Sequence, residues 1–253
     1  MKKIVCITGA TSGIGEACAR KFAKEGYNVM ITGRRKEKLE KLETDLRDSY
    51  NINVLSLCFD VQKKKEVFEA FENIPVSWQT IDVLINNAGL SLGRDSFIES
   101  SIKDWDTMIQ TNINGLLYVS KAIVPFMINN KKGHVINIGS VAGKEVYENG
   151  NVYCATKFSV DAISKSMRID LLKNGIKVTA IHPGAVETEF SIVRYKGDIQ
   201  KAKDVYKGFI PMTGEDVADT IYYTTTLPSH VCINEIVITP TQQAGTYYFH
   251  KEN

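Results

Sequence analysis

Short apolar runs alternate with longer amphipathic stretches along the whole chain. The apolar runs are continuous and do not alternate with polar residues, which is typical of strands buried on both faces of a parallel sheet. They predict seven strands, at residues 4–7, 29–32, 54–59, 83–85, 135–138, 177–181 and 235–238.

The amphipathic stretches have the spacing of helices that pack one face against a sheet. They predict helices at residues 15–24, 36–48, 63–72, 104–127 and 153–172. Strands that alternate with helices require right-handed crossovers, which place helices on both faces of the sheet. We therefore expect an α/β fold: a doubly wound three-layer sandwich with a mostly parallel seven-stranded sheet.

The length of 253 residues fits one α/β domain, and no repeat, low-complexity tract or linker divides the chain. Residues 184–211 interrupt the pattern because they carry little apolar periodicity. Long loops inside compact domains are usually functional or mobile. We expect a single domain over residues 1–253, with a substrate loop at about 185–211.

Composition excludes several classes of protein. A formal charge of +2 gives no support to a nucleic-acid or membrane-surface role. The five cysteines are widely spaced without a C-x-x-C pair, and the four histidines lie far apart. We therefore expect buried or partly buried free thiols, and neither a metal centre nor a disulfide framework. The apolar run at residues 4–7 is too short for a signal peptide, and no run of about 18 apolar residues exists to span a bilayer. We expect a cytoplasmic protein.

Glycines gather where the first predicted strand meets the first helix. The segment reads Thr8-Gly9-Ala10-Thr11-Ser12-Gly13-Ile14-Gly15. Glycines at such a junction let the backbone turn tightly and approach a pyrophosphate, while the helix N-terminus offers free N–H donors. We expect a dinucleotide there, bound by Gly9, Thr11, Ser12, Gly13, Ile14 and Gly15.

The end of the second predicted strand indicates which dinucleotide binds. An acidic residue at this point would hydrogen bond a ribose 2′-hydroxyl and select NAD. This chain has Gly33 followed by Arg34 and Arg35, and a guanidinium matches a 2′-phosphate. The residues favour NADP, and the alternative is a basic first helical turn that faces solvent.

Two further strand ends face the same edge of the predicted sheet. Asp60, followed by Val61, accepts from an adenine amino group or else caps the next helix. Asn87, Ala88 and Gly89 follow the fourth strand, where ligands of open α/β sheets gather, or else form a structural turn. We expect all five residues to border the cofactor.

Ser140, Tyr153 and Lys157 form the candidate catalytic set. Tyr153 and Lys157 are four residues apart and therefore share one helix face. A nearby ammonium lowers the pKa of a tyrosine, which then exchanges a proton with a substrate hydroxyl or carbonyl. Ser140 follows the fifth strand and is expected to hydrogen bond the same substrate oxygen.

Together these motifs resemble the short-chain dehydrogenase/reductase family, over essentially the whole chain. The resemblance implies a Rossmann-type fold and a homo-oligomer, dimer or tetramer. It also implies that Asn114 is a catalytic member that holds a water beside the lysine. The segment with Pro183, Gly184, Val186 and Thr188 resembles the family's nicotinamide-contacting segment, and His182 before it receives no role.

Longer strings resemble one group in that family, the NADP-dependent serine and 3-hydroxy acid dehydrogenases. They are residues 87–93, 150–153, 189–191, 194–198 and 238–243. The resemblance implies hydride transfer between NADP(H) and a small hydroxy or oxo acid. The alternatives are a general carbonyl or 3-oxoacyl-thioester reductase and, in another class, a non-catalytic NADP(H)-binding sensor.

The charged residues after Thr188 favour a small charged substrate over a long apolar one. They include Arg194, Lys196 and Asp198. A guanidinium binds a carboxylate through two parallel hydrogen bonds, so Arg194 is the candidate substrate clamp. The alternative is that this arginine faces solvent.

Overall fold

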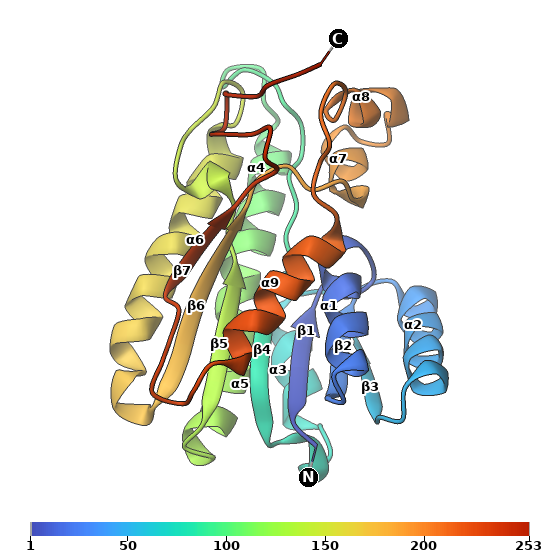
Figure 1. Cartoon of the computed structure of the whole chain (residues 1–253), viewed down its shortest axis with the longest axis vertical. Coiled ribbons are helices and arrows are strands. Elements are labelled where there is room, and N and C mark those ends of the chain that lie inside the picture. The colour runs from blue at the N-terminus through green and yellow to red at the C-terminus, as the bar shows by residue number, and fades with distance from the viewer. Residues whose placement is uncertain (1, 253) are drawn as a thin grey trace.

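The computed structural model describes residues 2–252, and its strands form one parallel seven-stranded sheet in the order β3-β2-β1-β4-β5-β6-β7 (Figure 1). The strand order reverses between the neighbouring strands β1 and β4, because the chain passes from the edge strand β3 back to β4. The strands are β1 Ile4–Thr8, β2 Asn28–Gly33, β3 Val54–Cys58, β4 Ile81–Asn86, β5 Gly133–Ile138, β6 Ile176–Pro183 and β7 Glu235–Ile238.

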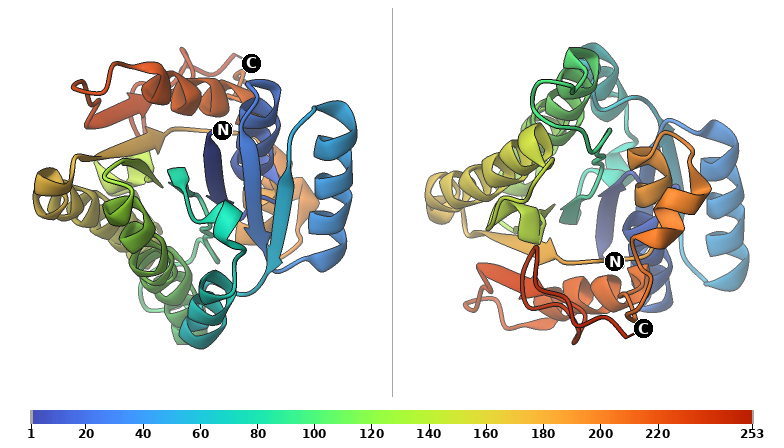
Figure 2. Two further views of the ribbon diagram at one scale, coloured as in Figure 1. Left: turned by 90° about the horizontal axis from the view of Figure 1, so that it is seen from below. Right: turned by 90° about the horizontal axis from the view of Figure 1, so that it is seen from above.

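Helices cover both faces of this sheet, as the alternation of elements predicts (Figure 2). Phe22 and Leu39 belong to the core on one face, and Phe71 and Ile123 belong to the core on the other. The first face carries α1 Gly13–Lys24, α2 Lys36–Ser49 and α9 Gly214–Thr226, and the second carries α3 Lys64–Glu72, α5 Leu116–Asn129 and α6 Asn151–Asp170. The predicted three-layer sandwich is confirmed.

The two edge strands differ from the prediction that every strand is buried on both faces. β3 is half-buried along most of its length, and the residues of β7 are exposed or half-buried. Each of these strands has a neighbour on one side only, so less of its surface is covered.

The long helix predicted at residues 104–127 is divided. It consists of α4 Ile102–Ile109, a π-helical turn Gln110–Gly115 and α5. A π-helical turn inserts an extra residue into the helical register, and such turns are frequent at functional sites.

The segment expected to be a loop at about 185–211 contains two short helices, α7 Glu189–Arg194 and α8 Ile199–Asp204. Both lie over the carboxyl ends of the strands, at the top of Figure 1. Single short turns complete the chain: η1 Val76–Trp78, η3 Val141–Gly143 and η4 Leu172–Asn174.

The cysteines form no disulfide. Cys6, Cys18 and Cys154 are buried and Cys232 is half-buried, but Cys58 at the end of β3 is exposed, which differs from the expectation of covered thiols. Across residues 2–252, none of the helices combines the length and apolarity needed to span a bilayer.

Candidate active site

A cleft of about 1000 Å³ opens at the carboxyl ends of the strands. It gathers nearly all the residues that the sequence places at the site, from segments far apart along the chain. Those that line it are Gly9, Thr11, Ser12, Gly13, Ile14, Arg34, Arg35, Asp60, Val61, Asn87, Ala88, Gly89, Ser140, Tyr153, Lys157, Pro183, Gly184, Val186 and Thr188. Gly15 and Asn114 do not line it.

The glycine loop has the backbone geometry that its sequence predicts. Gly9 and Gly13 have φ of +65° and +54°, in the left-handed region that favours glycine. A Cβ at Gly9 would lie 2.9 Å from the Ala88 Cα, so the loop and the end of β4 can approach only because that atom is missing. Gly15 serves packing, since a Cβ there would lie 2.4 Å from the Gly9 carbonyl oxygen.

The start of α1 is open to an anion. Ser12 is the N-cap residue, but its side chain accepts no hydrogen bond from the first turn. The first backbone N–H groups of a helix have no partner inside the helix, and the helix dipole adds partial positive charge there. The Asn87 amide instead donates to the Thr8 and Gly9 carbonyls at 2.8 and 3.2 Å and fixes the shape of the loop.

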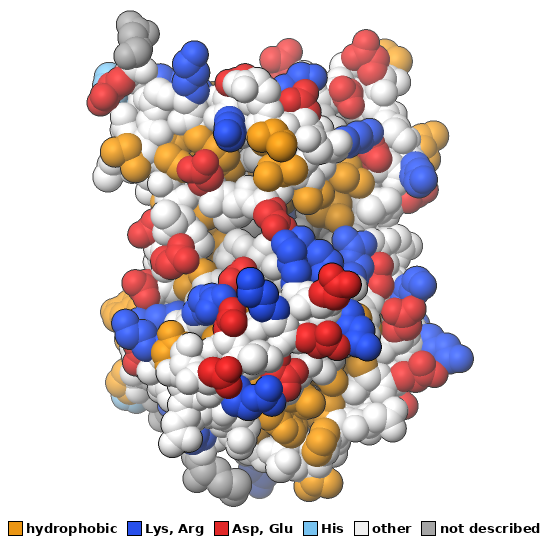
Figure 3. All heavy atoms as spheres, turned by 90° about the vertical axis from the view of Figure 1, so that its right-hand side faces the viewer, with side chains coloured by type: hydrophobic (Ala, Val, Ile, Leu, Met, Phe, Trp, Pro, Cys, Tyr) orange, Lys and Arg blue, Asp and Glu red, His pale blue; other side chains and the backbone are white. Residues whose placement is uncertain are grey.

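Arg35 lies against this loop. Its guanidinium donates to Thr11 Oγ1 and Ser12 Oγ, each at 2.8 Å, and to Glu189 Oε2 at 2.6 Å. Lys38 donates to the other oxygen of Glu189, also at 2.6 Å. Basic and acidic side chains mix across the middle of this side of the molecule (Figure 3).

Glu189 is held ionised by these two cations. Its partial burial favours the neutral acid, but the hydrogen bonds from Lys38 and Arg35 outweigh that effect and lower the pKa of Glu189 to about 2. The guanidinium of the neighbouring Arg34 lies 3.4 Å from the carboxylate of Asp60. Asp60 also accepts from the Gln62 backbone, so both of its carboxyl oxygens have partners within the protein.

Tyr153 and Lys157 enter the cleft from the first turns of α6, and both are buried. Lys157 Nζ donates to the Ile138 carbonyl at 2.9 Å and lies 5.9 Å from the centre of the Tyr153 ring. Burial lowers the pKa of Lys157 to about 8. Ser140 begins the short turn η3, where its hydroxyl accepts from the Ala142 N–H at 3.1 Å.

A second cation faces the tyrosine. The Arg194 guanidinium carbon lies 5.0 Å from the centre of the Tyr153 ring, closer than Lys157 Nζ. Burial raises the pKa of Tyr153, while the Arg194 charge and the Ser140 hydrogen bond act in the opposite direction. The helical spacing predicts only the lysine beside this tyrosine, and the structure adds the arginine.

Asn114 does not reach this site, which corrects the expectation taken from the family resemblance. Its amide donates to Gln110 at 2.9 Å along the same helix. Asn112 points in roughly the opposite direction, because residues two apart on a helix do so, and it lies buried behind the cleft residue Gly89. A Cβ at Gly89 would lie 3.3 Å from Asn112 Oδ1 and 3.7 Å from Lys157 Nζ, so both polar atoms lie near Gly89.

Of the three charged residues singled out after Thr188, which are Arg194, Lys196 and Asp198, Arg194 faces Tyr153. Its guanidinium also donates to the Tyr147 hydroxyl at 3.1 Å. Lys196 instead pairs with Asp104 at 2.7 Å, and Asp198 accepts from the Lys201 backbone at the start of α8. The side chains around Arg194 that the sequence analysis missed are Arg94, Tyr147 and Phe190.

Comparison with known proteins agrees with this geometry. The sequence model of the short chain dehydrogenase family matches residues 3–197. The NADP-dependent 3-hydroxy acid dehydrogenase YdfG of Salmonella typhi is 44% identical over 242 residues, 95% of this chain and 96% of that protein. Sulfoacetaldehyde reductase 2 of Chromohalobacter salexigens is 41% identical over 249 residues, 98% of each chain.

The fold is also that of solved structures. A closed form of serine dehydrogenase complexed with NADP+ has a TM-score of 0.91 and 42% identity, and the match covers 99% of this chain and all of that one. The family model, the relatives and the arrangement of Ser140, Tyr153 and Lys157 all point the same way. The chain belongs to the short-chain dehydrogenase family.

Proposed function

We propose that the protein is an NADP-dependent oxidoreductase that transfers hydride between NADP(H) and a small hydroxy or oxo acid. The observation that carries this proposal is the placement of Arg194, which sets a guanidinium beside the proton-transferring tyrosine. Serine, 3-hydroxy acids and sulfoacetaldehyde, the compounds named for its relatives, are small molecules with an acidic group.

The cleft fits two of the anionic groups of NADP(H), the pyrophosphate and the 2′-phosphate. The uncapped start of α1 and the left-handed glycines suit a pyrophosphate. Arg35 and Arg34, with Lys38 nearby, suit the 2′-phosphate, and no carboxylate stands at position 33 to bind a free ribose hydroxyl. NADP(H), when bound, supplies or accepts the hydride.

The protein's own residues handle the proton. Tyr153 exchanges it with the substrate oxygen, and Ser140 donates a hydrogen bond to that oxygen and polarises it. Lys157 and Arg194 favour the phenolate of Tyr153 by their charge. Asn112, in place of Asn114, is the asparagine that we assign to the lysine side of the site, because Asn112 Oδ1 and Lys157 Nζ both lie near Gly89.

The substrate is small and anionic. Arg194 lies 4.9 Å from the centre of the Phe190 ring and 6.0 Å from that of Tyr147, so aromatic side chains flank its guanidinium. A guanidinium held in this way binds a carboxylate through two hydrogen bonds and directs the hydroxyl carbon toward Tyr153. A general carbonyl or 3-oxoacyl-thioester reductase has no need of this charge.

A substrate screen tests the proposal. NADP+ reduction is followed with serine, allo-threonine and 3-hydroxypropionate, beside uncharged alcohols of the same size, and each reaction is repeated with NAD+. We expect turnover of the acids with NADP+ and a much lower kcat/KM for the alcohols. Equal use of acids and alcohols would favour the general carbonyl reductase.

Tyr153→Phe separates an enzyme from a cofactor-binding sensor. The ring remains and the proton-transfer group is removed, so NADPH should bind with near wild-type affinity while kcat falls about 10²–10⁴-fold. Fluorescence titration with NADPH and steady-state kinetics measure the two effects. Wild-type turnover in this variant would rule out the assigned mechanism.

A further inference from the structure

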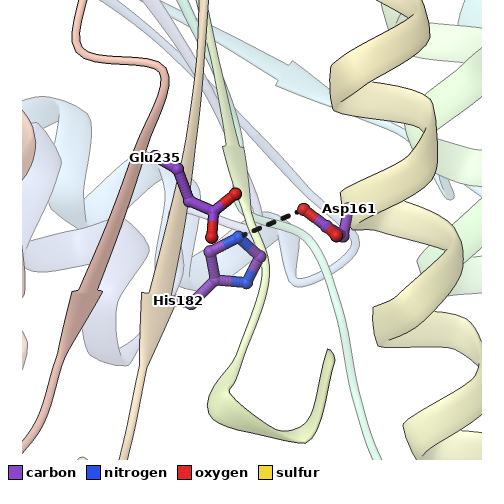
Figure 4. Close-up of side chains that lie close together, drawn as sticks. All are labelled: Asp161, His182 and Glu235. Carbon is purple, nitrogen blue, oxygen red and sulfur yellow. Dashed lines mark ion pairs between the residues drawn. The ribbon is translucent and has the colours of Figure 1, made fainter. Parts of the chain in front are cut away.

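A cluster of charged side chains around one buried histidine lies next to Ser140, outside the cleft. His182, at the end of β6, lies between Asp161 of α6 and Glu235 of β7 (Figure 4). The imidazole has no exposed surface. Its Nδ1 is 3.2 Å from the Ser140 carbonyl oxygen, and its Nε2 is 3.7 Å from Asp161 Oδ1.

The contact with Ser140 fixes the position of the ring proton. A carbonyl oxygen only accepts hydrogen bonds, so Nδ1 carries the hydrogen and donates it. Nε2 has no hydrogen-bond partner among the described residues, and in the neutral ring its lone pair faces the cluster. Gly139 makes this contact possible, because a Cβ there would lie 2.4 Å from Nδ1.

Lys144 already supplies the cation of this cluster. Its ammonium lies 2.9 Å from Asp161 Oδ1 and 2.6 Å from Glu235 Oε1. The other oxygen of Asp161 pairs with Lys165 at 2.7 Å. The two carboxylates are therefore compensated without a proton on His182.

The charge balance agrees with a neutral ring. Burial and the Lys144 ammonium lower the pKa of His182, while Glu235, the Ser140 hydrogen bond and Asp161 raise it by less. These are the charged groups that face the ring from α6, β7 and the segment after η3. A protonated ring would have a second N–H, at Nε2, directed at Asp161, whereas the neutral ring has a single N–H, at Nδ1, and donates it to the serine carbonyl.

We propose that His182 is a positioning residue for Ser140, and that Lys144 keeps it in the neutral form that donates Nδ1–H to the serine backbone. The hydrogen bond holds the start of η3, and with it the Ser140 hydroxyl, at its place beside Tyr153. This inference rests on the proposed function for its kinetic readout only. The protonation of His182 is measured separately.

His182→Ala and His182→Asn test the positioning role. Asparagine places an N–H donor near the position of Nδ1, whereas alanine removes it. We expect His182→Ala to lower kcat about 10²-fold, since small displacements of an active-site group cost rates of this order. NADPH affinity should be unchanged, and His182→Asn should restore most of kcat. A rate loss in His182→Asn equal to that in His182→Ala, with NADPH binding intact in both, would overturn the role of the hydrogen bond.

Lys144→Met and Lys165→Met test whether the Lys144 ammonium keeps His182 neutral. Each removes one lysine that pairs with Asp161, but only Lys144 also pairs with Glu235 and faces His182. Nitrogen-15 NMR of labelled histidine, in the protein with NADPH bound, should show His182 titrating at higher pH in Lys144→Met than in the wild type. Lys165→Met should titrate close to the wild type. Equal shifts in the two variants, or none, would overturn the role of Lys144. Because this readout needs no substrate, it stands even where the substrate screen fails.

Discussion

The guanidinium of Arg35 and the carboxylate of Glu189 form an ion pair of 2.6 Å that joins the segment after β2 to α7. Arg194 lies on the same helix α7, at its last residue. The corner proposed for the 2′-phosphate and the guanidinium proposed for the substrate are therefore linked through one short helix. A phosphate at Arg35 would compete with Glu189 for the same donor.

Glu189→Gln is expected to tighten NADP+ binding, because it removes a negative charge from the phosphate corner. The pair is partly exposed, and exposed pairs contribute about 0.2–1 kcal/mol, so we expect a gain of up to about fivefold for NADP+ and little change for NAD+. Isothermal titration with both cofactors measures it. Glu187→Gln, which removes an exposed carboxylate outside the cleft, is the control. Equal gains in the two variants would mean a general charge effect.

Arg35→Ala is expected to weaken NADP+ binding about 10-fold or more, since a hydrogen bond to a charged group contributes about 1.5–3 kcal/mol. The partial exposure of Arg35 places the effect near the low end. kcat/KM with NADP+ and NAD+ measures it, and Arg47→Ala, near the other end of α2 and outside the cleft, is the control. Gly33→Asp is a less clean test, because a Cβ at Gly33 would lie 2.9 Å from Thr11 Cγ2. If the wild type uses NAD+ as well as NADP+, the arginines do not select the cofactor.

Arg194→Ala is expected to raise KM for hydroxy acids about 10-fold or more and to leave KM for uncharged alcohols near the wild-type value, because a charge-assisted hydrogen bond to the carboxylate is lost. Lys203→Ala is the matched control, since Lys203 is an exposed cation on α8 that does not line the cleft. Steady-state kinetics on paired acids and alcohols measures KM for each type of substrate. The same rise in KM for both substrate types would remove Arg194 from substrate binding.

The reduction reaction is expected to slow above about pH 8, where Lys157 loses its proton. Burial lowers the pKa of this lysine, so the ammonium that supports Tyr153 is present below about pH 8 and lost above it. The pH profile of kcat/KM with NADPH measures this fall in rate, which is the alkaline limb of the profile. In Lys157→Arg the guanidinium does not titrate in this range, so the limb should move out of it. An unchanged limb in that variant would assign it to another group.

Asn112→Ala and Asn114→Ala should differ sharply in their effect on the free energy of unfolding. The Asn112 amide pairs with both the N–H and the carbonyl of Leu90, so its loss leaves buried backbone groups without partners at a cost of about 1–3 kcal/mol. Asn114→Ala should change the free energy of unfolding by less than about 0.5 kcal/mol and leave kcat near wild type. Urea unfolding measures the free energy of unfolding of each variant, and steady-state kinetics measures its kcat. A loss of activity in Asn114→Ala alone would restore the original assignment.

The sequence predicted the sheet and the glycine loop because both depend on local signals. A continuous apolar run marks a buried strand, and a glycine-rich turn marks a close backbone approach. The exposure of β3 and β7 could not be predicted in the same way. It depends on strand order, which the sequence of each strand does not carry.

The errors at the site have geometric causes. Asn112 and Asn114 are close in sequence and alike in chemistry, and only the direction of each side chain on the π-helical turn distinguishes them. Lys196 and Asp198 were expected to add charge to the substrate site, but each is engaged elsewhere. His182 was passed over because its partners Asp161 and Glu235 come from distant parts of the chain. The predicted homo-oligomer stays a prediction.

The exposure of Cys58 has a practical consequence for binding measurements. Of the five cysteines it alone is exposed, and its sulfur lies 3.8 Å from the backbone carbonyl of Arg34, at the rim of the cleft. A thiol-reactive fluorophore should therefore label Cys58 faster than the half-buried Cys232 and the three buried cysteines. A dye at that position would report on nucleotide arrival by its change in emission, and protection of the thiol by NADP+ would map the same corner chemically.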